Sequence, residues 1–277
     1  MAAPACFTPR GARFRKGVGG HAQDGSGLIG VAFSTPIEGY ELSGTEVFLG
    51  GFPDAEDRRG YKHEARPMQA VRKIVLKGAV DLYFRRYATP HLVVAGDTDE
   101  ALRRVKTTFK GDKLVIESEG VGVTIRSAQG GISINSVSGD IFINGQRIDV
   151  GNAGGGRAVV GVALPELPAL RVNGSGDVSL LDLRQAGLEI EIEGSGDVTA
   201  DGHVERLNVS IAGSGDVHAR ELIAMRGQLS IAGSGDISAH VSHEVVARVA
   251  GSGDIVVRGD PPVRSKQVVG SGSVRFK

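Results

Sequence analysis

The chain has 277 residues, and its 32 basic and 32 acidic side chains leave a formal net charge of zero. No basic face is implied, which argues against nucleic acid as a partner. Forty-two glycines, no tryptophan and 5% aromatic residues describe a turn-rich chain whose core is built from small aliphatic side chains. The single cysteine, Cys6, excludes an intrachain disulfide and a cysteine metal cluster.

Residues 1–66 carry the fewest structural signals. Their longest apolar run, Leu28–Phe33, is too short for a signal peptide or a membrane span. We expect this segment to be a weakly ordered or capping extension with one or two short strands. The sequence as written supports neither export nor a membrane span.

We expect the folded domain to cover residues 67–277. In Lys73–Leu82, apolar and polar residues alternate on both sides of a glycine, which predicts two strands joined by a corner. His91–Ala95 and Lys113–Glu117 predict further strands. Asp97–Val105 contains a capping residue, early acidic side chains and late basic ones, and this order is typical of a short helix.

Alternating apolar residues continue from Val121 to Ile148, where Ser138-Gly139-Asp140-Ile141 resembles the later corners. The sequence therefore predicts that the same architecture runs through this stretch. The glycine-rich segment Gly151–Gly156 then predicts a flexible loop between two lobes, residues 67–150 and 157–277. The segment lacks the Gly-Lys-Ser/Thr ending of a phosphate-binding loop.

The last third of the chain is organised around a repeated pentapeptide. Gly174-Ser175-Gly176-Asp177-Val178 is the first of five near-identical copies, and in a sixth copy Ser273 replaces the aspartate. The first glycines are 20, 19, 20, 18 and 19 residues apart, a period that indicates stacked repeats. Apolar and polar residues alternate around each copy, as in strands with one buried face. We expect an all-β fold, a β-solenoid with coils of about 19 residues and one short helix.

Both glycines of each copy permit the positive φ and the close backbone approach that a sharp, repeated corner requires. We interpret them as structural turn residues. They are Gly174, Gly176, Gly194, Gly196, Gly213, Gly215, Gly233, Gly235, Gly251, Gly253, Gly270 and Gly272.

Stacking also places the corner aspartates in a row. At a coil spacing of about 4.8 Å, neighbouring carboxylates repel by about 1 kcal/mol in water and by roughly 3 to 4 kcal/mol at an effective dielectric near 20. Turn amides, splaying into water or a bound cation can offset this repulsion. We favour aspartates that hydrogen-bond nearby amides, with no metal and no cofactor. Calcium is the alternative, and its candidate ligands are Asp177, Asp197, Asp216, Asp236 and Asp254.

Together these features resemble a known family. The Arg72–Gly78 strand, the Asp97–Val105 helix, the Gly111–Ile116 stretch and the five corners are similar to the putative auto-transporter adhesin, head GIN domain family, over about residues 67–277. The resemblance implies a right-handed, β-helix-like domain, commonly found in exported or envelope-associated bacterial proteins, and the name implies adhesion. It implies no activity, cofactor or catalytic residue. Because the chain has no recognisable export signal, the sequence does not decide between the envelope, secretion and the cytoplasm.

Enzymatic function is not favoured. β-Helix enzymes that act on polysaccharides need acidic and basic side chains grouped on one face, and no repeat carries a distinctive extra group of Asp, His and Arg. Four histidines of the repeats lie at different offsets from their corners, so we do not expect them to form a metal site. They are His203, His218, His240 and His243.

We therefore expect a non-catalytic binding or structural domain, with a carbohydrate-active β-helix enzyme and a calcium-stabilised scaffold as alternatives. A glycan or protein ligand is expected on the strand faces, for example beside Glu189, Glu191 and Glu193. Exposed solenoid ends are edge strands that a second copy of the chain can cover, so association through the ends is a further expectation. The corner serines offer another regular row: Ser175, Ser195, Ser214, Ser234, Ser252 and Ser271.

Overall fold

The computed structural model describes residues 61–118, 123–127, 130–134, 141–143, 146–148 and 156–277. By its internal contacts the chain divides into residues 1–41 and 42–277, and all described residues belong to the second unit. The expected extension therefore lies outside the described residues, apart from its last six positions. The elements before the repeats are β1 (Lys62–Arg66), β2 (Lys73–Gly78), β3 (Asp81–Arg86), β4 (His91–Gly96), α2 (Asp99–Arg104), β5 (Val105–Lys110), β6 (Lys113–Ser118), β7 (Val123–Ser127), β8 (Gly130–Ile134), β9 (Ile141–Ile143) and β10 (Gln146–Ile148).

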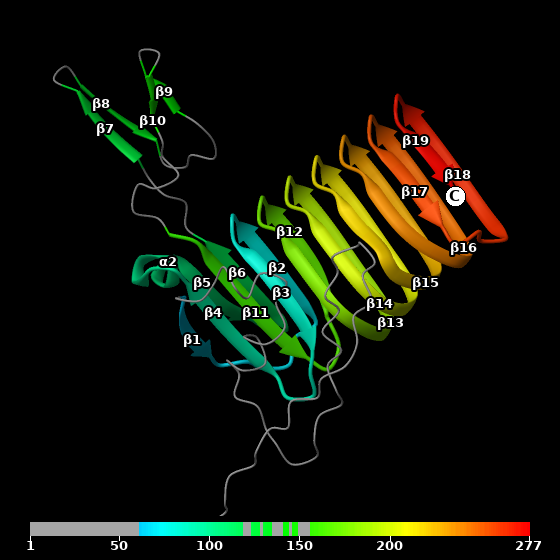
Figure 1. The fold of residues 1–277 in the computed structure, drawn as a ribbon, viewed down its shortest axis with the longest axis horizontal. Coiled ribbons are helices and arrows are strands. Elements are labelled where there is room, and N and C mark those ends of the chain that lie inside the picture. The colour runs from blue at the N-terminus through cyan, green and yellow to red at the C-terminus, as the bar shows by residue number, and fades with distance from the viewer. Residues whose placement is uncertain (1–60, 119–122, 128–129, 135–140, 144–145, 149–155) are drawn as a thin grey trace, which may run out of the picture. The chain divides into compact units, whose positions relative to one another are not determined.

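The repeats form a stack of parallel coils (Figure 1). Each long strand bends midway and supplies one segment to each of two strand faces. In one such strand, for example, Val198 pairs with Val178 and Val217 on the first face, whereas Leu207 pairs with Leu188 on the second. The predicted β-solenoid is confirmed, while its handedness stays a prediction. The strands of this part are β11 (Ala158–Leu164), β12 (Ala169–Gly174), β13 (Val178–Gly194), β14 (Val198–Gly213), β15 (Val217–Gly233), β16 (Ile237–Gly251), β17 (Asp254–Arg258), β18 (Val263–Gly270) and β19 (Ser273–Phe276).

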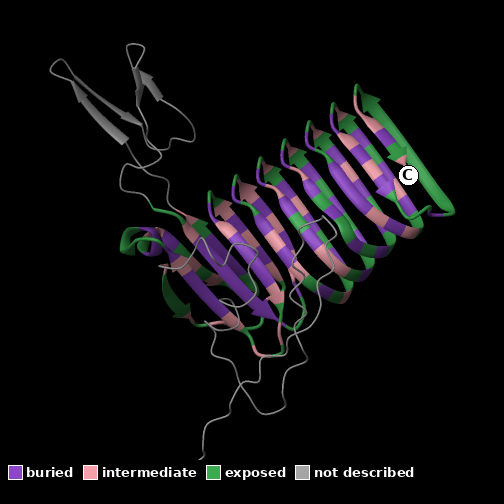
Figure 2. Cartoon of the chain, viewed as in Figure 1, coloured by how far each residue is buried: buried purple, intermediate pink, exposed green. Residues whose placement is uncertain are grey.

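Strict alternation of side chains builds the core between the two faces. Buried and exposed residues alternate along most of β14 and β15, as the purple and green bands of Figure 2 show. The buried residues are almost all Val, Leu, Ile or Ala, and Phe84 is the largest of the fully buried side chains. Small aliphatic side chains suit a narrow space between two faces, because each coil must match the coil below it in register.

The coil before the five clear copies is made by β2 and β3. Gly78 pairs with Gly174 in parallel register, and Leu82 pairs with Val178. The corner between β2 and β3 is therefore the next member of the stack, although its sequence is Gly-Ala-Val-Asp. The two strands and the corner predicted for Lys73–Leu82 are confirmed, and the register makes this stretch a degenerate copy of the later unit.

At the N-terminal end of the stack, the pairing changes from parallel to antiparallel. β4 pairs antiparallel with β11 and with β1, and β5 pairs antiparallel with β6. The predicted helix is present as α2, where Thr98 is the N-cap and its hydroxyl oxygen accepts a hydrogen bond from the Ala101 amide at 3.1 Å. Residues 62–66 of the expected extension supply β1, the outermost strand on the first face. None of the helices in the described part of the chain has the length and apolar character needed to cross a bilayer.

Residues 123–148 do not continue the coils as predicted. β7 pairs antiparallel with β8, and β9 with β10, in two separate two-stranded sheets. Only two residues separate the strands of each pair, a connection that permits a hairpin but not a parallel coil. Asn144-Gly145 between β9 and β10 is a strong hairpin signal that the alternation analysis missed. Ser138, Gly139 and Asp140 of the corner-like sequence lie outside the described residues.

Residues from both predicted lobes join one 15-stranded sheet, since β2 and β3 pair with β12, β11 and β13. Most of the glycine-rich segment between the predicted lobes lies outside the described residues.

Candidate functional site

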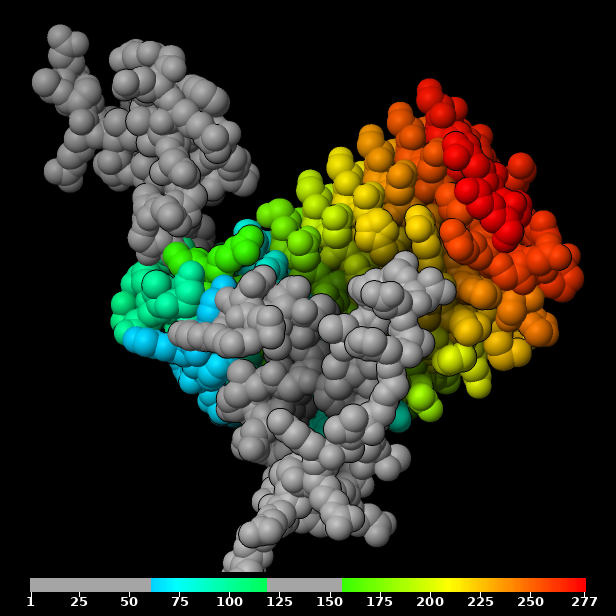
Figure 3. Space-filling model, in the orientation of Figure 1, coloured from blue at the N-terminus to red at the C-terminus, as the bar shows by residue number. Residues whose placement is uncertain are grey.

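The structure places the repeated glycines where two successive corners come closest. The first glycines have φ between 119° and 154°. A Cβ atom on the second glycine of a corner would lie only 2.0–2.4 Å from a backbone oxygen of the preceding coil. The corner serines are exposed at the surface, where the coils form successive bands from green to red (Figure 3).

The corner aspartates form a hydrogen-bonded row that begins at Asp81. The Oδ1 atom of each aspartate accepts a hydrogen bond from the backbone amide of the equivalent residue one coil later. For example, the Asp236 amide donates to Asp216 at 2.7 Å, and the Asp254 amide donates to Asp236 at 2.8 Å. Amide donors therefore offset part of the carboxylate repulsion. Calcium binding by this row stays a prediction.

The opposite corner of each coil absorbs the variation in repeat length. Thr199 pairs with His218, and Asp201 pairs with Glu221. One residue lies between the two paired positions on β14, whereas two residues, Ala219 and Arg220, lie between them on β15. On the other side of β15, the three residues from Arg220 to Leu222 have no paired residue on β16. β15 thus carries a bulge beside shorter neighbours, and such bulges redirect side chains.

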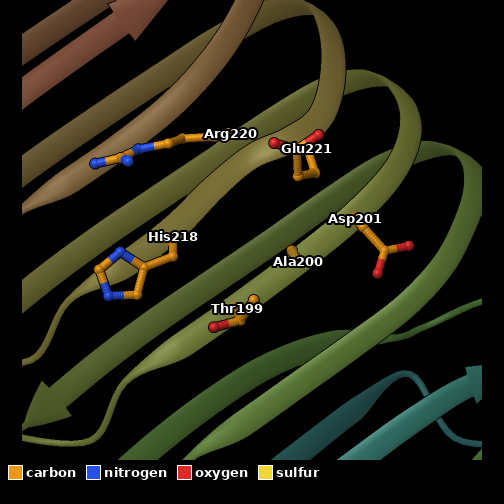
Figure 4. A pocket seen from close by; sticks show the side chains of 6 residues that line it. All are labelled: Thr199, Ala200, Asp201, His218, Arg220 and Glu221. Carbon is orange, nitrogen blue, oxygen red and sulfur yellow. The ribbon is translucent and has the colours of Figure 1, made fainter. Parts of the chain in front are cut away.

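This bulged corner borders a depression of about 370 Å³, which we call the β14–β15 depression (Figure 4). Neighbouring coils supply two acidic residues, Asp201 and Glu221, and the Arg220 guanidinium donates a hydrogen bond to Ser238 Oγ at 3.3 Å. His218 is exposed at the other side of the depression. The full lining is Thr199, Ala200, Asp201, His218, Arg220 and Glu221.

Asp201 has an unusual electrostatic environment in the depression. Burial raises the pKa of its carboxyl above the ordinary value of 3.8, and the nearby charges of Asp182 and Glu221 raise it further. The hydrogen bond from the Asp182 amide to Asp201 Oδ1, at 2.7 Å, opposes this rise. The group is therefore a carboxyl that protonates more readily than an exposed aspartate.

The acidic residues singled out on the second face are largely engaged within the protein. Lys73 Nζ contacts Glu191 at 2.8 Å, and Arg171 forms an ion pair with Glu193. A second depression, of about 260 Å³, lies beside Glu189 and Arg206. Reversing these charges would disturb ion pairs of the fold, so Glu191 and Glu193 are poor probes of ligand binding.

A family model described as "Putative auto-transporter adhesin, head GIN domain" matches residues 71–261. The chain belongs to this family. The match covers β2 to β6, the helix α2 and five of the six Gly-Ser-Gly corners, and it begins after β1. The family resemblance carried by the sequence is confirmed.

One solved structure with a TM-score above 0.5 shares the fold of this chain. A crystal structure of a putative adhesin from Bacteroides fragilis NCTC 9343 is 17% identical, with a TM-score of 0.54, and the alignment covers 79% of this chain and 98% of that one. A putative adhesin from Parabacteroides distasonis ATCC 8503 is 15% identical, with a TM-score of 0.46 over 79% of this chain and 98% of that one. No protein with a curated description matches the chain. The first of these structures supports the fold, and at this identity it carries no ligand across.

Sequence reasoning missed the polar group that lines the β14–β15 depression. The expectation that no repeat gathers extra acidic, histidine and arginine residues does not hold, because His218, Arg220 and Glu221 of one coil border Asp201 of the coil before it. The available signal was the 20-residue spacing of this repeat between repeats of 19 and 18 residues. An inserted residue next to charged side chains indicates a bulge, and this insertion lies away from the Gly-Ser-Gly-Asp corners that define the repeat.

Proposed function

We propose that this head GIN domain protein is a non-catalytic, adhesin-like module that binds a glycan at the β14–β15 depression. The observation that carries the proposal is the grouping of donors and acceptors at one bulged corner of an otherwise regular stack. The family description names adhesion, which supports a binding role. An envelope location is part of the proposal and rests on the same description.

The chemistry of the depression suits sugar hydroxyls. Asp201 and Glu221 supply acceptors, Arg220 supplies donors, and Thr199 supplies both. Because the depression is open and carries both signs of charge, a neutral polymer can cross it without burying an unpaired ion. Protein interfaces are centred on aromatic (Trp, Tyr, Phe) and arginine anchors, and Arg220 is the one lining residue of these types, with no such aromatic side chain beside it.

An array of immobilised glycans tests this proposal. We expect retention of the unmodified chain, and a loss of at least tenfold in affinity for the Arg220→Ala/Glu221→Ala double variant. The matched control, Asn208→Ala/Gln228→Ala, removes exposed polar side chains from the second face of the same coils and should bind normally. Equal binding by both double variants, or no retained glycan at all, would overturn the assignment. Capture of a protein instead would identify the other ligand class.

Glycoside hydrolysis is the second candidate function. It is favoured by the raised pKa of Asp201 and by the neighbouring Glu221, because glycosidases use a carboxylic acid and a carboxylate together. Incubation of the protein with the glycans that the array retains distinguishes hydrolysis from binding alone. Release of reducing ends by the unmodified chain, abolished in Asp201→Asn, would make the domain an enzyme. Binding without release supports the adhesin-like module.

The ends of the solenoid are a second surface at which a partner, namely another copy of the chain, was expected to bind. β18 and β19 each leave one strand edge unpaired among the described residues. Arg264 and Lys266 occupy core-facing positions of this last coil, in register with buried Val245 and Ala247. Charges at such positions oppose the docking of a further coil. We therefore propose that the domain acts without end-to-end stacking.

A further inference from the structure

Asp197, Asp216 and His218 come together on the outward side of the stack. Each offers one ligand atom, and these three atoms all lie within 4.8 Å of one another. The two aspartates are successive members of the corner row. His218 follows Asp216 by two residues, and this spacing places both side chains on the same side of an extended chain.

The carboxylates keep free coordination capacity in this arrangement. Oδ1 of Asp197 accepts a hydrogen bond from the Asp216 amide at 2.9 Å, and Oδ1 of Asp216 accepts one from the Asp236 amide at 2.7 Å. These bonds fix the orientation of both carboxylates, while the second oxygen of each stays available. Among the described residues, no Lys or Arg side chain forms an ion pair with either aspartate.

The last coil shows how a side chain at the position equivalent to His218 can contact a corner aspartate. Thr199, His218, Ser238, Val256 and Arg275 occupy one row across five coils. Arg275 reaches back to the aspartate of the preceding coil, where its guanidinium contacts Asp254 Oδ2 at 3.1 Å. A positive charge thus occupies this place in the final coil. In the coil of β15, the same position holds an imidazole, which can bind a metal ion through nitrogen.

We propose that Asp197, Asp216 and His218 form a zinc site. Calcium takes oxygen ligands, whereas imidazole together with carboxylates suits Zn²⁺. Ligand bonds of about 2.0–2.2 Å in a tetrahedron put ligand atoms roughly 3.4 Å apart, so small rotations of the exposed His218 ring and the carboxylates complete the geometry. Three protein ligands leave one position for water or a ligand oxygen.

The zinc site borders the β14–β15 depression, because His218 contributes to both. It does not depend on the proposed glycan function, since the ligand set is complete without a sugar. Zinc binding is therefore measured on the full chain with no glycan present. The two proposals can fail separately.

Isothermal titration with Zn²⁺ alone tests the site. We expect one Zn²⁺ per chain, and a loss of at least tenfold in affinity for His218→Ala and for Asp197→Asn/Asp216→Asn. The asparagine variant retains the amide acceptors, so it should fold normally, and circular dichroism checks this. The matched controls are His203→Ala and Asp236→Asn, which change an exposed histidine and a corner aspartate outside the cluster and should leave the affinity unchanged.

Substitution with Co²⁺ gives a second readout, because tetrahedral Co²⁺ with a nitrogen ligand absorbs visible light strongly. The band should be present in both controls and absent in His218→Ala. Zinc binding that is unaffected by His218→Ala, or a site at which Ca²⁺ displaces Zn²⁺ at equal concentration, would overturn the proposal. The absence of stoichiometric zinc would do the same.

Discussion

Gly235 has no room for a Cβ atom, because that atom would lie 2.0 Å from the backbone oxygen of Gly215 in the preceding coil. The contact is backbone to backbone, so no flexible side chain can move to relieve it. The corner glycines therefore set the coil spacing as well as the turn. Their role follows from stacking and holds for every copy.

Gly235→Ala should destabilise the protein by about 2–3 kcal/mol and lower its melting temperature by roughly 5–10 °C, because the coils must separate locally to admit the methyl group. Thermal unfolding followed by circular dichroism measures this. Gly187→Ala is the control, since its Cβ would meet nothing closer than an Arg206 nitrogen at 4.0 Å. Equal melting temperatures for the two variants would contradict the stacking account.

The Asp201 carboxyl gives a pH-dependent prediction. Its folded-state pKa lies above the ordinary 3.8, so the folded state binds the proton more tightly than the unfolded chain does. The ionised form therefore costs stability at neutral pH, and this cost disappears as the pH falls through the raised pKa toward 3.8. Asp201→Asn, which keeps the acceptor for the Asp182 amide, should melt above the unmodified chain at pH 7.

At pH 4 the difference between Asp201→Asn and the unmodified chain should shrink. Asp201→Ala is the comparison variant, because it removes the charge and also the acceptor, and it should melt below Asp201→Asn at both pH values. A melting difference between Asp201→Asn and the unmodified chain that does not change with pH would show that Asp201 is not perturbed by burial.

At the scale of elements, α2 depends on a single cap. Thr98 accepts a hydrogen bond from the Ala101 amide, and the helix has only six residues, of which Ala101 and Leu102 are buried. Thr98→Ala should destabilise the helix by about 1 kcal/mol and speed hydrogen exchange in residues 99–104. Thr98→Ser preserves the acceptor and should exchange at the original rate. Fast exchange in both variants would mean that packing at the end of the stack, rather than the cap, governs the helix.

The elements that the sequence predicted share one property, which is that their signal is local. The period of two, the Gly-Ser-Gly-Asp corners and the capped helix are each visible within a few residues, and the structure confirms them. The hairpins of residues 123–148 show the same alternation as the coils, so alternation alone could not separate antiparallel from parallel pairing. The β14–β15 depression depends on the register between coils of unequal length. It could not be predicted from one repeat alone, because the register appears only when neighbouring repeats are paired.

At the scale of the molecule, the two ends of the stack are closed differently. Antiparallel strands and α2 cover the N-terminal end, whereas the last coil carries Arg264 and Lys266 at core-facing positions. The Arg264 guanidinium lies 5.0 Å from the centre of the Phe276 ring, and it also pairs with Asp260. A charged final coil blunts an edge that would otherwise accept another strand.

Lys266→Val should extend the apolar stripe to the open edge and cause association that depends on concentration. Size-exclusion chromatography with light scattering measures the mass. Gln267→Val is the control, because this position is in register with the exposed, outward Arg248 and adds no apolar surface to the core stripe. A Lys266→Val variant that keeps the mass of the unmodified chain at every concentration would argue that something other than charge closes this end.

The central claim is that one bulged corner of the solenoid holds the ligand. Hydrogen exchange measured by mass spectrometry, with and without the glycan that the array retains, tests this claim most directly. We predict slower exchange in peptides covering residues 199–221 and unchanged exchange in the equivalent segments of β16 and β17. Protection spread evenly over all coils, or confined to the second face, would contradict the account.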